Sequence, residues 1–431
     1  MSIIPRSPKI VVKKPQLAPQ SPEDCLVALD IGTEYVKVLI ARQNKKDGTL
    51  NITGVGRAHQ ASGNMYDGAI ADIGGVVSTC EKALSEAESE ANVTAKLAVV
   101  GIAGELIKGN TSTVRYRRKN GNRPISEAEM SAIIKRVQDR AGEKAKKEVA
   151  LETNNPNVEV RLINSAIVSL QIDGYKVSNP IGFKGSDLTI QFYTAFAPLV
   201  HISAIEKVCA ELSLDLLAVA VEPFAVCRAC LGDDLDSNFS AIVMDIGGGT
   251  TDIAIVDDGG VEGTKMFGIG GRSFTHQIST KLGVDFDTAE KYKVNLESSN
   301  FPPEVRSRID GAIDTNLSVW LSGVSIALED FSDMLETFPG RILLCGGGAG
   351  LSALQEQLAT SDWYEDLPFS RRPLVHIVDD EDIPGINNAT ETDLDFSFIT
   401  AFGLLRVALD TLAGDPGDSG LRAKFAKLLQ N

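Results

Sequence analysis

Apolar residues near the start of the chain come in short runs, of the length that buried strands need. Residues 25–32 read CLVALDIG, and residues 36–43 read VKVLIARQ after a turn at Thr33-Glu34-Tyr35. Runs of this kind, bounded by a turn, predict two strands joined as a hairpin. A helix is predicted over 76–91, because apolar residues there recur at helical spacing.

The pattern then changes to that of a compact αβ unit. Asn120-Gly121 lies within a basic segment and predicts a hairpin tip. Ser126 followed by Glu129 has the spacing of a capping box, which predicts the start of a helix. Two long strand patterns follow this helix. We therefore predict an αβ insertion over about 97–196.

A second hairpin is predicted where SAIVMDIGGG (240–249) runs into TTDIAIVDDGG (250–260). It repeats the strand, the Asp-Ile-Gly, the turn with Thr and the second strand of the first hairpin. The two aspartates, Asp30 and Asp245, lie about half the chain apart. This long-period repeat predicts two related halves. Helices are expected over most of 272–335.

Charge and composition limit the possible functions. The 431 residues carry a net charge of −16, with +4 on residues 1–22 and +3 on residues 421–431, so the stretch between holds −23. An acidic body argues against general nucleic-acid binding. No apolar run is long enough for a membrane span or for the apolar part of a signal peptide. The Cys227–Cys230 pair lies in a helical pattern without a second pair or a nearby His, so we do not expect a metal or redox site.

The two echoed hairpins predict a phosphate site. Each joins strand to strand, which excludes the Rossmann fingerprint and the P-loop. Glycine-rich turns let a phosphate approach backbone N–H groups, and an Asp at the strand end can reach hydrated Mg²⁺. DIGT alone is compatible with an ordinary hairpin turn, but the three successive glycines of DIGGGTTD are poor strand formers, so an ordinary hairpin explains this second segment less well. A third segment, LLCGGGAGLSAL (343–354), adds a glycine turn between a strand and a helix.

These three motifs, in this order, resemble those of the actin, heat-shock-protein and sugar-kinase superfamily. Within it, the chain is similar to the FtsA family of bacterial cell-division proteins over about 25–412. The insertion lies where FtsA carries its 1C subdomain, and its NPIGFKG segment (179–185) resembles one in that subdomain. LGVDFDTAEKYK (282–293) resembles the FtsA helix that flanks the adenosine. The resemblance implies an actin-like α/β fold, in which two duplicated RNase H-like domains flank a nucleotide cleft and a 1C (SHS2) insertion is added.

The resemblance also implies roles for individual residues toward ATP and Mg²⁺. Asp30 and Asp245 would hold Mg²⁺ through water, and Glu222 with Asp245 would position the attacking water. Glu290 and Lys293 would contact the base or ribose; an i,i+3 ion pair in solvent explains this pair equally well without the family. The remaining ligands would be backbone and hydroxyl groups of the three turns: Gly32, Thr33, Gly247, Gly248, Gly249, Thr250, Thr251, Gly346, Gly347 and Gly348. Gly270 and Gly271 match the family turn that enters subdomain 2B.

The resemblance further implies a division of the chain into subdomains. The expected parts are a disordered tail (1–22), subdomain 1A (23–96 and 197–240), subdomain 1C (97–196), subdomain 2A (241–271 and 336–400), subdomain 2B (272–335), a return helix to 1A (401–412), a linker (413–420) and a terminal helix (421–431).

The terminal segment LRAKFAKLLQN has an amphipathic pattern. Its apolar residues recur at helical spacing, and its basic residues lie largely off that stripe; the set is Leu421, Arg422, Lys424, Phe425, Lys427, Leu428 and Leu429. A weak interfacial membrane helix fits this pattern. Docking on the chain's own body or on a partner protein is the alternative.

Together these features predict an ATP-binding, actin-like protein that polymerises on the cytoplasmic face of the inner cell membrane. The implied partners are anionic lipid, further copies of the chain, the C-terminal tail of FtsZ and other divisome proteins, with no nucleic acid. ATP hydrolysis is expected to be slow or conditional. The alternatives are a PilM-type component of type IV pilus assembly and a small-molecule kinase of the same superfamily. The basic segment 113–123 and the Pro-rich tail are either solvated charge or contacts to lipid or to an acidic neighbouring subunit.

Overall fold

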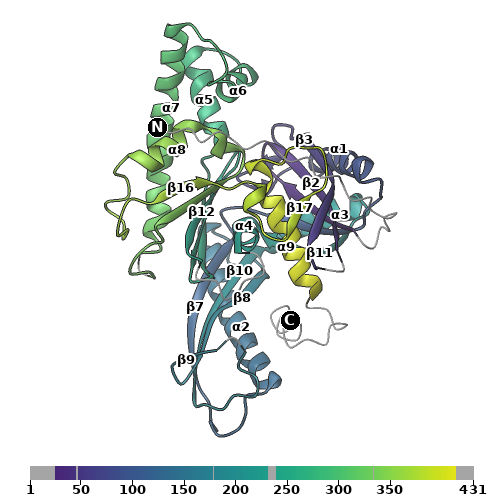
Figure 1. Cartoon of the computed structure of the whole chain (residues 1–431), viewed down its shortest axis with the longest axis vertical. Helices are drawn as coiled ribbons and strands as arrows, with labels where there is room; N and C mark the ends of the chain where they lie inside the picture. Colours follow the sequence, from purple (N-terminus) through teal and green to yellow (C-terminus); the bar gives the residue numbers. More distant parts are fainter. Residues whose placement is uncertain (1–24, 45–46, 178, 232–238, 333, 414–431) are drawn as a thin grey trace.

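The computed structural model describes residues 25–44, 47–177, 179–231, 239–332 and 334–413. It is elongated, with one group of helices at the upper end of Figure 1, two sheets in the middle and the αβ insertion at the lower end. The predicted tail 1–22 and the terminal segment 421–431 lie outside the described residues, as does the linker apart from its first residue, Ala413.

The first sheet is built around the first predicted hairpin. Its strands lie in the order β11-β6-β1-β2-β3-β17. The bounds are β1 (Cys25–Ile31), β2 (Tyr35–Gln43), β3 (Leu50–His59), β6 (Leu97–Ile102), β11 (Asp215–Val221) and β17 (Ile386–Asn388). β1 pairs antiparallel with β2 and parallel with β6, and β6 pairs parallel with β11. Helix α1 (Ile73–Ala91) packs on β2 and β3, and a small hairpin of β4 (Met65–Tyr66) and β5 (Ala69–Ile70) precedes it.

The second sheet repeats this arrangement. Its first five strands lie in the order β16-β15-β12-β13-β14. The bounds are β12 (Ala241–Ile246), β13 (Thr251–Asp257), β14 (Gly260–Phe267), β15 (Arg341–Cys345) and β16 (Leu374–Ile377). β12 pairs antiparallel with β13 and parallel with β15, as β1 does with β2 and β6. Equal strand order with equal strand directions confirms the predicted two related halves.

Helices cover both faces of the second sheet. Helix α4 (Glu222–Leu231) contacts β12 and β13, and it packs against α9 (Ile399–Ala413), which lies on β1 of the first half. Apolar residues of β12 therefore alternate between two cores: Ala241 and Val243 belong to the core shared with the first half, whereas Ile242 and Met244 belong to the core of the second half. The second-half helices are α5 (Gly271–Leu282), α6 (Phe286–Val294), α7 (Pro303–Glu329) and α8 (Ser352–Thr360). They confirm that 272–335 is mainly helical.

The insertion is a two-layer unit with its own core. It contains β7 (Lys108–Arg117), α2 (Glu127–Glu152), β8 (Val160–Ile172), β9 (Tyr175–Lys176) and β10 (Asp187–Pro198), after which α3 (Leu199–Glu211) returns to the first half. β7 also pairs with β14, through Asn110 with Gly263 and Gly109 with Thr264. The insertion thereby extends the second sheet to nine strands and joins it to the first half.

The start of α2 confirms one local prediction and corrects another. The backbone N–H of Glu129 donates to Ser126 Oγ at 3.2 Å, so Ser126 caps the helix. The Glu129 carboxylate instead accepts from Arg118 at 2.8 Å, and this pairing lowers the pKa of Glu129. Asn120-Gly121 does not form the tip of a hairpin, because β7 pairs with β10 and the chain passes directly into α2.

Two predicted boundaries differ from the structure. Leu97–Ile102 was assigned to the insertion, but it is β6 and lies in the first sheet between β1 and β11. The inserted unit therefore begins after Ile102. Ile386–Asn388 was assigned to subdomain 2A, but it pairs parallel with β3 of the first half. Both segments lack a local signal for their sheet, since strand pairing depends on residues far away in the sequence.

Candidate functional site

A cleft of about 450 Å³ lies between the two halves, a volume typical of small-molecule sites. Both hairpins, the third glycine turn, α5, α6 and the start of α9 contribute to its wall. Most of the predicted ligands line it: Asp30, Gly32, Thr33, Glu222, Asp245, Gly247, Gly248, Thr250, Glu290, Lys293, Gly346, Gly347 and Gly348. Gly271 lines it as well, at the predicted turn into the second-half helices.

The first hairpin places Asp30 at the end of β1. Its side chain is 4% exposed and pairs with Lys37 on β2, with 2.8 Å between Lys37 Nζ and Asp30 Oδ2. Burial disfavours the ammonium, but the nearby carboxylates, Asp30 first, outweigh burial and raise the pKa of Lys37. In the turn, Gly32 donates its N–H to Tyr35 O at 3.1 Å. A Cβ on Gly32 would lie 2.7 Å from this oxygen, so the turn requires glycine.

The second hairpin places two carboxyl groups opposite each other. Asp245 on β12 pairs in register with Asp252 on β13, and both are buried. Thr400 donates to Asp245 Oδ2 at 2.5 Å, and Thr250 donates to Asp252 Oδ2 at 3.1 Å. Burial, with the charge of Asp245 as a smaller cause, raises the pKa of Asp252 to about 8. Burial also raises the pKa of Asp245, although the Thr400 hydroxyl and Lys37 oppose that shift.

The turns of the two hairpins meet across the cleft. A Cβ on Gly248 would lie 2.9 Å from Glu34 Cβ, and one on Gly249 would lie 3.0 Å from Thr33 Oγ1. The glycines of the second turn are therefore required because the first turn packs closely against them, whether or not a ligand also contacts their backbone. This contact confirms that the hairpins face each other, as their echo predicts.

The third glycine turn lies directly behind Asp245. Gly346 has φ of +80°, and a Cβ there would lie 2.1 Å from Asp245 Oδ1. A Cβ on Gly348 would lie 2.5 Å from the Ile246 side chain. At Gly347, by contrast, a Cβ would meet no described atom within 4 Å. The turn is thus packed on one side and open at Gly347, where a flat ligand can approach the backbone.

Glu222 begins α4 beneath the hairpins. It is half-buried and lines the cleft, and a Cβ on Gly101 would lie 3.0 Å from its Oε1. Burial is the main cause that raises the pKa of Glu222 well above its usual range, and the charges of Asp30 and Asp252 add to the effect. The Lys37 ammonium opposes these shifts, because its positive charge favours the ionised forms of Glu222 and Asp245.

Glu290 and Lys293 on α6 form the expected pair, with 2.8 Å between Lys293 Nζ and Glu290 Oε2. The pair is not a solvated surface contact, since the Lys293 side chain is only 12% exposed. Lys293 also donates to Gly271 O at 2.9 Å and to Thr275 Oγ1 at 2.8 Å, and Thr275 donates to Glu290. These bonds fix α6 on α5 at the edge of the cleft.

Two of the predicted ligands, Gly249 and Thr251, do not line the cleft. Thr251 is buried; its hydroxyl donates to Ile269 O and accepts from Trp320 Nε1. Its side chain therefore belongs to the core of the second half. Gly249 packs against Thr33 and does not line the cavity. Strand alternation explains Thr251, because its neighbours Thr250 and Asp252 have the opposite orientation.

Sequence reasoning missed six charged residues of the cleft: Glu34, Lys37, Arg57, Asp252, Arg272 and Asp395. Lys37 had a signal, since it is a lone charge within the apolar run of β2 and lies across from Asp30 when the hairpin is written in register. Asp252 had one as well, because it occupies in the second hairpin the position of Lys37 in the first. Glu34 and Arg272 are far apart in the sequence and had none.

No group of three or more His, Cys, Asp or Glu side chains in the described part of the chain is arranged to hold a metal ion directly. None of the described helices is long and apolar enough to cross a membrane. The thiols of Cys227 and Cys345 are buried, and burial raises the pKa of both. Such thiols are unreactive.

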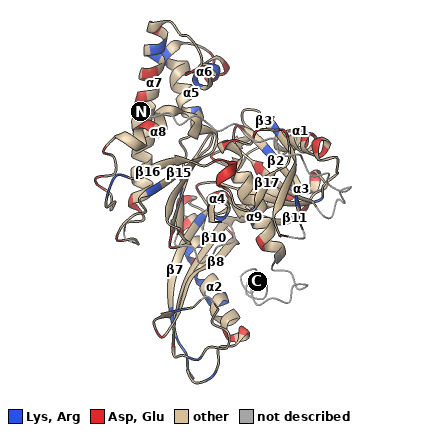
Figure 2. Cartoon of the chain, viewed as in Figure 1, with Lys and Arg blue, Asp and Glu red and all other residues tan. Residues whose placement is uncertain are grey.

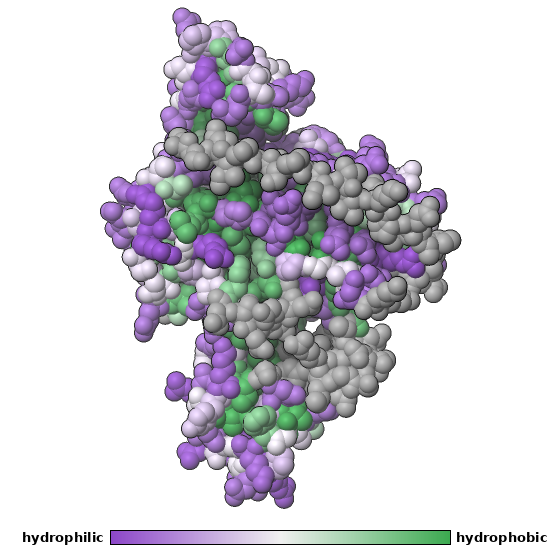
Figure 3. Space-filling view, viewed as in Figure 1, coloured by the Kyte–Doolittle hydropathy of each residue, from purple (hydrophilic) through white to green (hydrophobic). Residues whose placement is uncertain are grey.

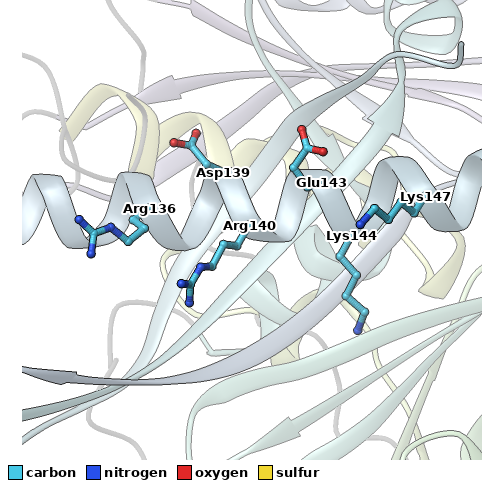
Figure 4. Close-up of a pocket in the computed structure, with 6 residues that line it drawn as sticks. All are labelled: Arg136, Asp139, Arg140, Glu143, Lys144 and Lys147. Carbon is cyan, nitrogen blue, oxygen red and sulfur yellow. The ribbon is translucent and has the colours of Figure 1, made fainter.

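A second hollow, of about 380 Å³, lies outside the cleft on α2 of the insertion. Figure 4 shows Arg136, Arg140 and Lys144 along one side of the helix, with Asp139 and Glu143 pointing the other way. The hollow is open and is formed by splayed side chains of a single helix. It does not bring together groups from different elements, so we assign no chemistry to it.

Known proteins resemble this chain in sequence and in fold. A family model described as cell division protein FtsA matches residues 242–367. FtsA of Streptococcus pneumoniae is 27% identical over 352 residues, which are 78% of this chain and 73% of that protein. FtsA of Neisseria meningitidis is 25% identical over 434 residues, covering 94% and 97% of the two chains. A chain of the PilM–PilN type IV pilus biogenesis complex superposes with a TM-score of 0.63 at 16% identity, covering 89% of this chain and 98% of that one.

These similarities confirm two of the predictions. The chain is similar to the FtsA family over most of its length. Its fold is the predicted actin-like α/β fold.

Proposed function

We propose that this chain, similar to FtsA proteins, is an ATP-binding, actin-like protein of bacterial cell division. One observation carries the proposal: two hairpins of equal topology face each other across a cleft in a chain similar to FtsA, and each has an aspartate near the end of its first strand. The experiment that tests it directly is titration of the full chain with Mg·ATP by calorimetry. Saturable binding is expected, and no binding to either ATP or ADP would overturn the proposal.

The residues present fit a nucleotide with a magnesium ion. The open position at Gly347 accepts a flat base or ribose, and Glu290 with Lys293 borders it. The N–H groups of Gly32 and Gly247 donate within their own turns, so the backbone N–H groups of Thr33 and Gly248 would face the phosphates. Asp30 and Asp245 are separate carboxylates, and they suit an ion that keeps most of its water. When bound, the metal would neutralise phosphate charge.

The chain's own groups would then act on charge and water. Glu222 lies beneath both hairpins. Because its pKa is raised, it stays protonated up to a higher pH than an ordinary glutamate does. A protonated carboxyl donates a hydrogen bond, but it cannot accept a proton from water. ATP hydrolysis by this chain would therefore be slow until a nearby cation lowers the pKa of Glu222.

We further propose that the chain polymerises at the cytoplasmic face of the inner membrane, as a peripheral protein. Residues 421–431 would bind anionic lipid, and the FtsZ tail and other divisome proteins would be recruited there. The amphipathic pattern of that segment supports the membrane contact. One such short helix is a weak anchor, so that stable attachment requires several linked copies.

The membrane proposal is tested by co-sedimentation with anionic vesicles. The full chain and a chain ending at residue 420 are compared, each with and without Mg·ATP, and neutral vesicles serve as the control. We expect binding by the full chain that increases with Mg·ATP and falls sharply without residues 421–431. A full chain that stays in the supernatant under every condition would contradict this proposal.

A PilM-type role in pilus assembly is the second candidate, because the pilus-complex chain superposes over 89% of this chain. In that role the chain would bind a membrane-protein peptide and would not need its own lipid-binding segment. Vesicle binding that depends on residues 421–431 favours the FtsA type. Binding that requires an added membrane protein favours the PilM type.

A further inference from the structure

An incompletely satisfied carboxylate lies at the meeting point of the two hairpin turns. Glu34 follows Thr33 in the first turn, and its side chain is 18% exposed. Its Oε1 lies 2.8 Å from His59 Nε2, but its Oε2 is buried and makes no hydrogen bond. The nearest cation to Oε2 is Arg272, whose Nε lies at 3.7 Å. A carboxylate oxygen without a hydrogen bond is costly at such a site.

Arg272 reaches this carboxylate from the other half. It lies in the first turn of α5, and its backbone N–H donates to Gly248 O at 2.8 Å in the second hairpin. Its guanidinium lies 5.3 Å from the centre of the Phe286 ring and lines the cleft. Among the residues that the structure describes, no carboxylate other than Glu34 lies within ion-pair distance of Arg272. The contact therefore crosses the cleft between halves.

Three other cations that line the cleft already make close contacts. Lys37 is held by Asp30 at 2.8 Å, and Lys293 is held by Glu290 at the same distance and by two further acceptors. Arg57 is stacked on Tyr35, with 3.9 Å between its guanidinium carbon and the ring centre. Arg272 thus has the loosest ion pair of these residues, and it lies beside the turns that form the phosphate cradle.

We propose that Arg272 binds the terminal phosphate of a nucleoside triphosphate and that Glu34 competes with this phosphate for it. The inference rests on the proposed nucleotide binding and adds a determinant of specificity to it. A guanidinium forms paired hydrogen bonds with phosphate oxygens, whereas its contact with Glu34 is a single ion pair at 3.7 Å. A diphosphate would lack the group that displaces Glu34, so Arg272 favours the triphosphate.

The test measures the dissociation constants of Mg·ATP and Mg·ADP on the full chain. Arg272→Gln is expected to weaken Mg·ATP binding about tenfold, the loss typical of one charged hydrogen-bonded contact, with Mg·ADP changed less than about twofold. Glu34→Gln removes the competitor, so Mg·ATP should bind several-fold more tightly. Lys281→Gln, at the exposed far end of α5, removes the same charge and is the matched control.

Each outcome decides between the proposals. A wild-type chain that binds neither nucleotide overturns the proposed function and this inference together. A wild-type chain that binds both, with an unchanged ATP-to-ADP ratio in Arg272→Gln, overturns only the inference. Weaker Mg·ATP binding in Glu34→Gln also overturns it, because Glu34 would then support the ligand. Thermal unfolding of each variant shows whether it is folded, and Glu34→Gln tests the idea independently of Arg272→Gln.

Discussion

At the scale of single residues, the cleft contains buried carboxyl groups of which only some are paired with a cation. Lys37 neutralises Asp30 directly, while Asp245 and Asp252 face each other with hydroxyl donors but no ion pair that the structure describes. Burial keeps a carboxyl protonated when no cation is near. This arrangement makes the stability of the protein depend on pH through identifiable groups.

Asp252→Asn should flatten the pH dependence of stability. Burial raises the pKa of Asp252 from its ordinary value of 3.8 to about 8, so between pH 4 and 8 the folded state keeps a proton that the unfolded state loses. Stability contributed by this proton is present at low pH and is lost as pH rises, by at most about 1.4 kcal/mol per pH unit. Urea unfolding at pH 5, 6.5 and 8 measures the slope. Asp314→Asn, on the exposed surface of α7, should leave the slope unchanged.

Lys37→Gln should destabilise the protein, and more so at high pH. The substitution leaves Asp30 without its cation and removes the charge that opposes the raised pKa of Glu222 and Asp245. Breaking a buried pair by removing one partner costs about 3–5 kcal/mol. Because acid protonates the remaining carboxyls, the loss should be smaller at pH 5 than at pH 8 in the same unfolding experiment. An equal loss at both pH values would contradict this account.

At the scale of elements, close backbone contacts depend on small residues at positions where helices and turns cross. Gly403 on α9 is one of them, since a Cβ there would lie 2.3 Å from Ala225 O on α4. These two helices link the halves beneath the cleft. The contact therefore determines how closely the halves approach.

Gly403→Ala should destabilise the protein by about 2 kcal/mol, since a Cβ in a closely packed crossing forces the backbones apart. Helix propensity alone would make Ala more stable than Gly by about 1 kcal/mol. A destabilising result would therefore come from the close packing of α4 and α9. Gly311→Ala on α7 is the matched control, because a Cβ there meets nothing within 4 Å. The control should be stabilising. A stabilising Gly403→Ala would show that α4 and α9 tolerate separation.

At the scale of the whole molecule, the insertion differs from the rest of the chain in charge. Residues 103–198 carry 15 Lys and Arg against 10 Asp and Glu, whereas residues 199–413 carry 13 against 35. In Figure 2 acidic residues are spread over the helices and sheets above the insertion. In Figure 3 hydrophilic side chains cover the upper helices, and apolar ones gather near the middle of the visible face. The acidic body inferred from net charge thus contains a basic unit.

Gly109→Val should loosen the junction between the insertion and the second half. A Cβ at residue 109 would lie 2.1 Å from Thr264 Oγ1 on β14 and 2.6 Å from the Tyr193 hydroxyl on β10, and both of these residues are buried where β7 meets β14. Faster hydrogen exchange of the β7 and β14 amides is the expected result. Lys176→Gln serves as the control, because its ion pair with Asp258 is exposed and worth about 1 kcal/mol or less. Unchanged exchange in Gly109→Val would contradict a structural role for this seam.

Local patterns were enough to predict the two hairpins, the third glycine turn, the helical character of 272–335 and the capping role of Ser126. Each depends on residues that are close together in the sequence, and the echo around Asp30 and Asp245 added the two related halves. Long-range pairing was beyond such patterns. The sequence of Leu97–Ile102 predicts a strand, but it would do so in either sheet, and no neighbouring residue indicates that the strand belongs to the first one.

The sequence by itself therefore determined the elements, the duplicated plan and most of the cleft lining, because periodicity and turn chemistry act over a few residues. Only the tertiary structure decided which distant strands join and that Thr251 points into a core. It alone brought Glu34 and Arg272 to one point, more than two hundred residues apart. Contacts between halves depend on how the sheets pack, and packing is a property of the whole chain.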